Sequence, residues 1–108
     1  MNRVFKALAD PTRRRVLQLL RDRPMLAGEL ADHFDVSKPT MSAHFAILQD
    51  AGLIDADKQG RTIVYRLKMS VLEEALLQFA HTLGWELTTA ERARGSRVVK
   101  RRPLKSGA

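Results

Sequence analysis

Small polar and basic side chains gather between residues 37 and 44, a segment whose chemistry suits contact with nucleic acid. Hydroxyl groups can bond a phosphate or the edge of a base, and a lysine can reach a phosphate or a guanine acceptor. A single such residue is equally typical of a solvated helix face, so the hypothesis depends on the whole set. The predicted contact residues are Ser37, Lys38, Pro39, Thr40, Ser42, Ala43 and His44. For His44 two interpretations stay open, donation to a phosphate and packing at the helix surface.

A second group with suitable chemistry is Lys58, Gln59, Gly60 and Arg61. These residues fall at the tip of a predicted β-hairpin. A basic hairpin tip that follows a DNA-reading helix can reach a neighbouring groove or phosphate. We therefore predict two contact regions, a helix and a wing.

Residues that carry catalytic or metal chemistry are sparse. The chain has no cysteine, which excludes disulfides, thiolate ligands and cysteine nucleophiles. Glycine-rich phosphate loops, metal-binding His-Glu motifs and nucleophile elbows are absent from the sequence. Glu73 and Glu74 would point about 100° apart on a helix, so we interpret them as solvated charges. His81 is better explained as a surface or interface residue than as a ligand. We predict no enzymatic activity, no cofactor and no metal site.

Hydrophobic periodicity predicts the helices that would position the first group. Helices are expected over residues 3–9, 11–21 and 25–34, and a fourth from an N-cap at Ser37 to a stop at residues 51–52. In the fourth helix Met41, Phe45 and Leu48 recur at the spacing of one buried face. This burial would leave the polar side chains facing outward.

The pattern changes after Leu53. Residues 54–58 and 61–68 flank Gln59 and Gly60, and apolar residues alternate with polar ones along the second segment, which predicts a β-hairpin. Ser70 is expected to cap a fifth helix with an unusually wide apolar face. The element order α-α-α-α-β-β-α predicts a mainly α protein with a small β-hairpin, a winged helix-turn-helix.

Almost all of the excess positive charge of the chain lies at its C-terminal end. The formal net charge is +7 over 108 residues, yet residues 1–90 hold twelve basic and eleven acidic side chains. We expect a folded domain at residues 1–87 and a basic, largely disordered tail at residues 88–108. The tail could add nonspecific phosphate contacts or serve only solubility, and the sequence leaves both open.

The chain is expected to act in the cytoplasm. Its apolar runs are all far shorter than the ~18 residues that a membrane-spanning helix needs. The N-terminal residues lack a continuous hydrophobic stretch followed by a cleavage site, so a signal peptide is not expected. We predict no membrane partner.

Three stretches together resemble the ArsR/SmtB family of winged-helix repressors. They are FKALADPTRRRVLQLL, LAGELADHFDVSKPTMSAHFAILQDAGLI and KQGRTIVYRL, and the combination of ADPTRRR with SKPTMSAHF resembles the SdpR-like autorepressor branch. The resemblance implies a homodimer built from the first and last helices, bound to a nearly palindromic double-stranded operator. The implied interface residues are Val4, Phe5, Leu8, Leu72, Leu76, Phe79 and Leu83.

The sequence departs from the family pattern at two places. Many relatives carry Arg or His where this chain has Ala43, so a common polar contact is absent there or replaced by contact with a thymine methyl. The cysteine metal site of the third helix is also absent, and the last helix begins Val71-Leu72-Glu73-Glu74 instead of with the Asp-x-His pair of the alternative site. The resemblance therefore implies a repressor without a metal effector.

Three functional hypotheses remain open. The first is a dimeric, autoregulatory repressor that needs no effector. The second is a sensor of the same fold that responds to a metal or another ligand. The third is a nucleic-acid-binding protein that ignores sequence and acts through the basic tail.

Overall fold

The structure is a computed structural model that describes residues 2–87 and 98–100. The chain forms two compact units, Met1–Leu72 and Glu73–Ala108. The first unit holds the predicted contact regions. The predicted boundary after residue 87 stays a prediction.

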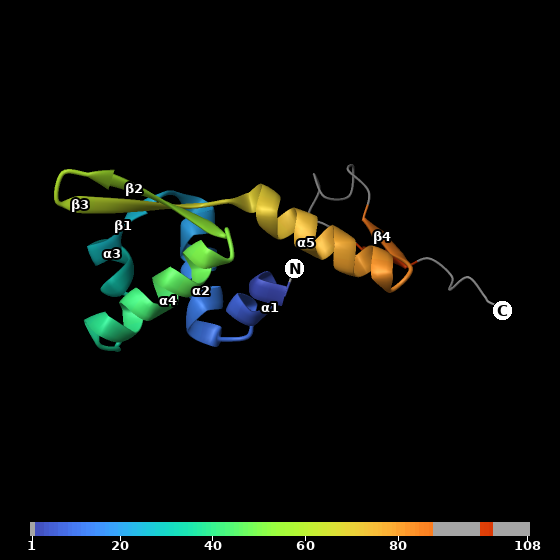
Figure 1. The fold of residues 1–108 in the computed structure, drawn as a ribbon, viewed down its shortest axis with the longest axis horizontal. Coiled ribbons are helices and arrows are strands. Elements are labelled where there is room, and N and C mark those ends of the chain that lie inside the picture. The colour runs from blue at the N-terminus through green and yellow to red at the C-terminus, as the bar shows by residue number, and fades with distance from the viewer. Residues whose placement is uncertain (1, 88–97, 101–108) are drawn as a thin grey trace. The chain divides into compact units, whose positions relative to one another are not determined.

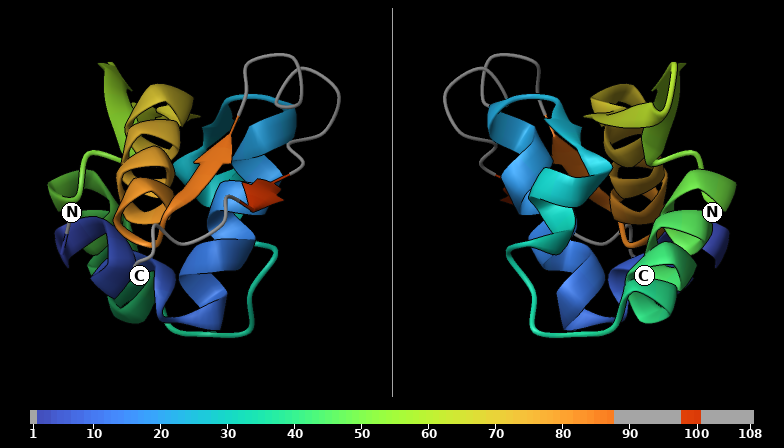
Figure 2. Two further views of the ribbon diagram at one scale, coloured as in Figure 1. Left: turned by 90° about the vertical axis from the view of Figure 1, so that its right-hand side faces the viewer. Right: turned by 90° about the vertical axis from the view of Figure 1, so that its left-hand side faces the viewer.

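Three helices form the centre of the first unit: α1 at Asn2–Leu8, α2 at Pro11–Asp22 and α4 at Lys38–Asp50. Each contacts the other two, and Figures 1 and 2 show α1 and α2 in blue beside α4 in green. Their facing side chains are apolar and nearly inaccessible, with Ala7, Val16 and Leu48 fully buried. This packing confirms the mainly helical prediction and fixes α4 from one side.

Asp10 begins α2 as its N-cap. Its carboxylate accepts hydrogen bonds from the backbone N–H of Thr12 (2.7 Å) and of Arg13 (3.2 Å). Partial desolvation raises the pKa of Asp10, but the N–H donors of Arg13 and Thr12 and the charge of Arg13 outweigh it and leave the pKa below its usual 3.8. The cap is therefore strongest with the carboxylate ionised.

The strands of the first unit form an antiparallel sheet of order β1-β3-β2, from β1 at Met25–Leu26, β2 at Ile54–Gln59 and β3 at Thr62–Leu67. The hairpin β2–β3 projects beyond the helices as the wing (Figure 1). At the centre of the sheet, Tyr65 of β3 pairs with Met25 on one side and Ala56 on the other. Burial raises the pKa of Tyr65.

The prediction of one helix over residues 25–34 was wrong at both ends. Met25 and Leu26 form β1, and the helix α3 spans only Ala27–Ala31. After α3 the backbone tightens into turns, in which the N–H groups of His33 and Phe34 bond to carbonyls three residues back. Two residues are too few to reveal strand alternation, and their partner strand lies far along the chain.

Helix α5 covers Met69–Thr82, so it starts in the first unit and continues in the second. The predicted cap at Ser70 was wrong, because Ser70 is already inside the helix. The carbonyl of Lys68 instead accepts the N–H groups of Val71 (3.1 Å) and Leu72 (3.5 Å).

Beyond α5, the second unit contains two short antiparallel strands, β4 at Trp85–Leu87 and β5 at Val98–Lys100. The prediction of a largely disordered tail is therefore wrong for Val98–Lys100, which pairs with β4. The rest of the predicted tail, residues 88–97 and 101–108, lies outside the described residues.

Within the described part of the chain, none of the helices combines the length and apolar character needed to cross a membrane.

Candidate nucleic-acid interface

Helix α4 is held from behind by a buried apolar face. Met41, Phe45 and Leu48 are 1%, 5% and 0% exposed. The ring of Phe45 also contacts that of Tyr65, with centroids 4.7 Å apart, which connects α4 to β3, one of the two strands of the wing. The opposite face of α4 thus has a defined position relative to the hairpin.

The first turn of α4 is organised by Ser37, as predicted from its N-cap position. Its hydroxyl oxygen accepts the N–H of Thr40 (3.2 Å), and its O–H donates to the hydroxyl oxygen of Thr40 (2.9 Å). This second bond leaves the hydroxyl hydrogen of Thr40 available to an outside acceptor. Because Pro39 has no N–H and that of Thr40 is capped, side chains supply most of the donors at this end of the helix.

The structure places the predicted helix residues at the start of α4, and they differ in exposure at one position. Six of them are exposed, and His44 is half-buried against α2, where its Nδ1 lies 3.2 Å from Nη1 of Arg13. The exposed members are Ser37, Lys38, Pro39, Thr40, Ser42 and Ala43. We call these six residues and His44 the recognition surface.

The predicted wing residues all lie at or beside the turn between β2 and β3, and all are exposed. Gly60 has a φ of 64°, in the left-handed region that favours glycine, which explains the residue at this tight turn. Thr62 donates its O–H to the carbonyl of Gln59 (2.8 Å), and the amide of Gln59 donates to Asp57 (3.1 Å). The side chain of Gln59 is therefore already engaged.

The basic ends of the wing tip remain available. Lys58 and Arg61 are exposed, and within residues 2–87 and 98–100 neither forms an ion pair. Two cations on a projecting turn can reach the phosphates beside a bound helix.

Sequence reasoning missed Arg13. It stands first in a run of three arginines, yet it is only 9% exposed, whereas Arg14 and Arg15 are exposed. A signal was present, because Arg13, Val16, Leu17 and Leu20 share the i, i+3, i+4, i+7 spacing of one helix face. Basic residues are so often solvated that composition alone hides a buried one.

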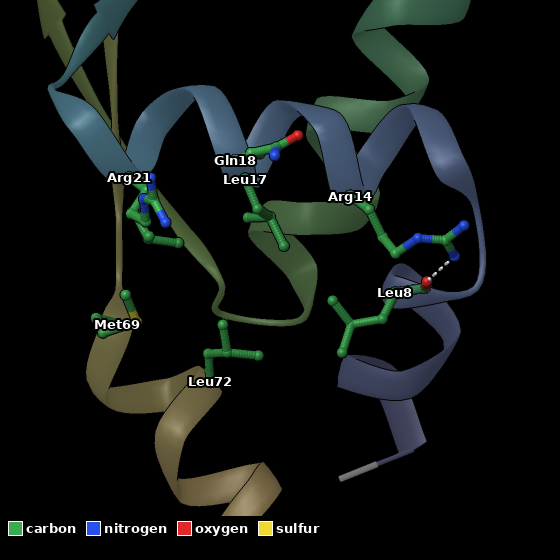
Figure 3. A pocket seen from close by; sticks show the side chains of 8 residues that line it. Leu8, Arg14, Leu17, Gln18, Arg21, Met69 and Leu72 are labelled. Carbon is green, nitrogen blue, oxygen red and sulfur yellow. Dashed lines mark hydrogen bonds between the residues drawn. The ribbon is translucent and has the colours of Figure 1, made fainter. Parts of the chain in front are cut away.

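The structure also contains a shallow hollow within the first unit, shown in Figure 3, with a volume of about 240 Å³. Leu8, Leu17 and Leu72 give it an apolar lining, and Arg14 at its edge donates to the carbonyl of Leu8 (2.8 Å). Gln18, Arg21, Leu67 and Met69 complete the lining.

The predicted dimer residues differ in how much surface they keep. Val4 is 5% exposed and belongs to the protomer's own core, which leaves it little area for a partner, while Phe5, Leu8 and Leu72 are half-buried. In the part of α5 that belongs to the second unit, Leu76, Phe79 and Leu83 are 40%, 45% and 51% exposed.

The described residues contain no group of three or more metal-binding side chains. His81, Glu73 and Glu74 therefore do not form such a group in that part of the chain.

Comparison with known proteins agrees with this architecture. A helix-turn-helix domain family matches residues 8–56. The chain is 46% identical over 76 residues to the transcriptional repressor SdpR of Bacillus subtilis (strain 168), covering 70% of this chain and 84% of that protein.

Two further matches extend the comparison. The chain is 40% identical over 74 residues to the HTH-type transcriptional regulator CmtR of Mycobacterium tuberculosis (strain ATCC 25618 / H37Rv), covering 68% of this chain and 63% of that protein. It thus spans less than two thirds of that regulator. The crystal structure of an ArsR family transcriptional regulator superposes with a TM-score of 0.71 at 36% identity, covering 76% of this chain and 90% of the other.

Proposed function

This chain belongs to the ArsR/SmtB family of winged helix-turn-helix transcriptional repressors and is a DNA-binding repressor, and on that premise we propose how it binds and regulates. The start of α4 enters the major groove of operator DNA, and the wing tip contacts phosphates beside it. Repression follows because the bound protein occludes RNA polymerase. The family is one of regulators rather than of enzymes, and the protein acts in the cytoplasm, where its operator lies.

The observation that carries this proposal is the recognition surface on a helix fixed by its own core. Lys38, Thr40 and Ser42 are exposed on α4, whose other face is buried almost completely. A rigid helix that displays short polar groups can hold them in register with base edges, because little ordering remains for the moment of binding.

We further propose that the repressor is a homodimer and binds a nearly palindromic operator. Leu76, Phe79 and Leu83 expose apolar area on α5, and the hollow beside Leu8 and Leu72 adds an apolar surface in the first unit. Exposed apolar area of this kind is typical of interaction surfaces. A two-fold dimer presents two identical recognition helices, so the two half-sites should be related by symmetry and about one helical turn apart.

We also propose that the protein represses its own operon without a metal effector. The support is the absence of cysteine from the chain and the similarity to SdpR. Operator binding titrated in the presence and absence of Zn²⁺ and other divalent cations tests this proposal. Unchanged affinity is expected, and release of DNA by a metal would favour the sensor hypothesis.

The central experiment replaces Lys38, Thr40 and Ser42 together by alanine. Each good base contact contributes ~1–3 kcal/mol of discrimination, so the variant should lose its preference for operator over random DNA. Footprinting upstream of the protein's own gene locates the operator, and fluorescence anisotropy measures both affinities. The matched control replaces Arg15, Asp22 and Gln49 by alanine, because these exposed residues lie outside the recognition surface, the wing tip and the hollow.

The outcomes separate the hypotheses. Full preference in the triple variant would contradict the proposed recognition surface. Equal affinity of the unmodified protein for operator and random DNA would favour sequence-blind binding, which replacing Arg101, Arg102 and Lys105 by glutamine should then abolish.

Measurement of the molecular mass in solution at micromolar concentration tests the dimer. Leu76→Glu should dissociate the dimer, while Leu26→Glu, at a residue equally exposed (40%), should not.

A further inference from the structure

Arg13 connects three elements of the first unit through one guanidinium group. Its Nε donates to the carbonyl of Ala7 (2.8 Å) and its Nη2 to the carbonyl of Lys6 (3.0 Å), both in the last turn of α1. Its Nη1 lies 3.2 Å from Nδ1 of His44 on α4. With the side chain anchored on α2, the group bridges α1, α2 and α4.

The contact with Arg13 sets which nitrogen of the His44 ring acts as the acceptor. A guanidinium has donors and no acceptor, so Nδ1 of His44 must be the unprotonated nitrogen in this hydrogen bond. In the neutral ring the proton then resides on Nε2. Within the described residues, Nε2 of His44 makes no hydrogen bond to the protein.

The bonds to α1 hold Arg13 in place independently of His44. The carbonyls at a helix C-terminus carry partial negative charge, which favours a cation there. Two charge-assisted bonds to fixed carbonyls leave the third nitrogen of the planar guanidinium little freedom. The orientation of the His44 ring is therefore set from behind the recognition surface.

We propose that Arg13 is a positioning residue for DNA binding: it holds His44 as the Nε2–H tautomer, so that this nitrogen donates to an acceptor on the operator. The inference rests on the proposed docking of α4 in the major groove. Arg13 itself stays buried and does not touch DNA. Arg13 influences DNA binding only by orienting the imidazole ring of His44. It stabilises the fold through its hydrogen bonds to the α1 carbonyls.

The first test is nitrogen NMR of histidine-labelled full-length protein. In the unmodified protein Nδ1 of His44 should be unprotonated and Nε2 should carry the proton. In Arg13→Lys a single ammonium cannot keep all three contacts, and His44 should show a mixture of tautomers. A proton on Nδ1 of the unmodified protein at neutral pH would overturn the proposal.

The second test is a double-mutant cycle on operator affinity with Arg13→Lys and His44→Phe. His44→Phe should bind operator about tenfold or more weakly, the loss expected for a charge-assisted hydrogen bond. Arg13→Lys should bind only about two- to fivefold more weakly, because its tautomer mixture still contains the Nε2–H form. In the His44→Phe background, Arg13→Lys should cost no further affinity. Additive losses would show that Arg13 acts on DNA binding by a route other than His44 and would overturn the proposal.

Controls keep folding and docking separate from this result. Arg15→Lys, at an exposed neighbour, should leave affinity unchanged, and urea unfolding of every variant reports stability. His44→Gln retains an amide donor and should restore part of the affinity lost in His44→Phe.

If Lys38, Thr40 and Ser42 prove dispensable while the cycle still shows coupling, the docking proposal fails and the role of Arg13 stands. Equal losses on operator and random DNA identify a phosphate acceptor, and a selective loss on operator identifies a base.

Discussion

The recognition surface and the wing tip present similar polar chemistry on very different supports. Helix α4 is fixed by three buried side chains and by the Arg13 contact to His44, so its exposed groups inherit the rigidity of the core. The tip of the hairpin depends on strand pairing and on one glycine with a positive φ. This difference suggests a division of labour, in which a rigid helix reads bases and an adaptable turn follows phosphates.

The most disruptive way to test the comparison is to remove the support of α4. Phe45→Ala deletes a buried ring and its contact with Tyr65, and should cost about 3–5 kcal/mol of unfolding free energy. Chemical denaturation measures the loss. The exposed neighbour Ala46 offers a control, since Ala46→Ser should change stability little. A loss below about 1 kcal/mol would show that the core does not hold the helix as described.

Gly60→Ala should weaken the wing by a smaller amount. A Cβ at Gly60 meets nothing within 4 Å, so the penalty is conformational, about 1–2 kcal/mol for the left-handed backbone. Gly28→Ala is the matched control, because Gly28 also has open space but sits in α3, where alanine should stabilise by about 0.5–1 kcal/mol. Relative to the unmodified protein, the urea midpoint should fall in Gly60→Ala and rise in Gly28→Ala. Equal shifts of the two midpoints would contradict the strained turn.

Arg61→Gln should affect binding without affecting discrimination. Loss of one phosphate contact weakens operator and random DNA alike and lowers the slope of log affinity against log salt by about 1. Titrations at several salt concentrations measure it. Arg66→Gln, at an exposed residue of β3 away from the tip, should leave the slope unchanged. A selective loss on operator DNA would instead make the wing a base reader.

The smallest expected effect concerns the cap that starts α2. Because the pKa of Asp10 is lowered in the folded protein, its ionised carboxylate stabilises the fold above pH 3.8, and this contribution is lost as the pH falls through the lowered value. Asp10→Asn keeps a capping oxygen but does not titrate, so its stability should converge with that of the unmodified protein in acid. Asp22→Asn serves as the control. Parallel stability curves for Asp10→Asn and the unmodified protein would contradict the cap's ionic character.

Local sequence patterns were sufficient to predict the start of a helix wherever its capping residue lay next to it in the sequence. Asp10 before Pro11 marked the start of α2, and Ser37 before Lys38 marked that of α4, because capping uses residues only a few positions apart. Strand β1 and the pairing of β5 were not predicted, because each depends on a partner distant in sequence. The prediction of Ser70 as the cap was wrong because the backbone carbonyl of Lys68, and not the Ser70 side chain, accepts the N–H groups at the start of α5.

By itself the sequence was enough to identify the family, through the three stretches that resemble it. It also predicted which side of α4 is buried, because helix periodicity assigns the faces of a helix without knowledge of its neighbours. Helix periodicity places Arg13 on the apolar face of α2, but only the tertiary structure decided which acceptors its buried guanidinium meets. Arg13, Arg14 and Arg15 are chemically identical, and only the packing of α1 and α4 against α2 gives Arg13 acceptors in place of water. A buried charge requires fixed partners in three dimensions, and no local pattern records where they are.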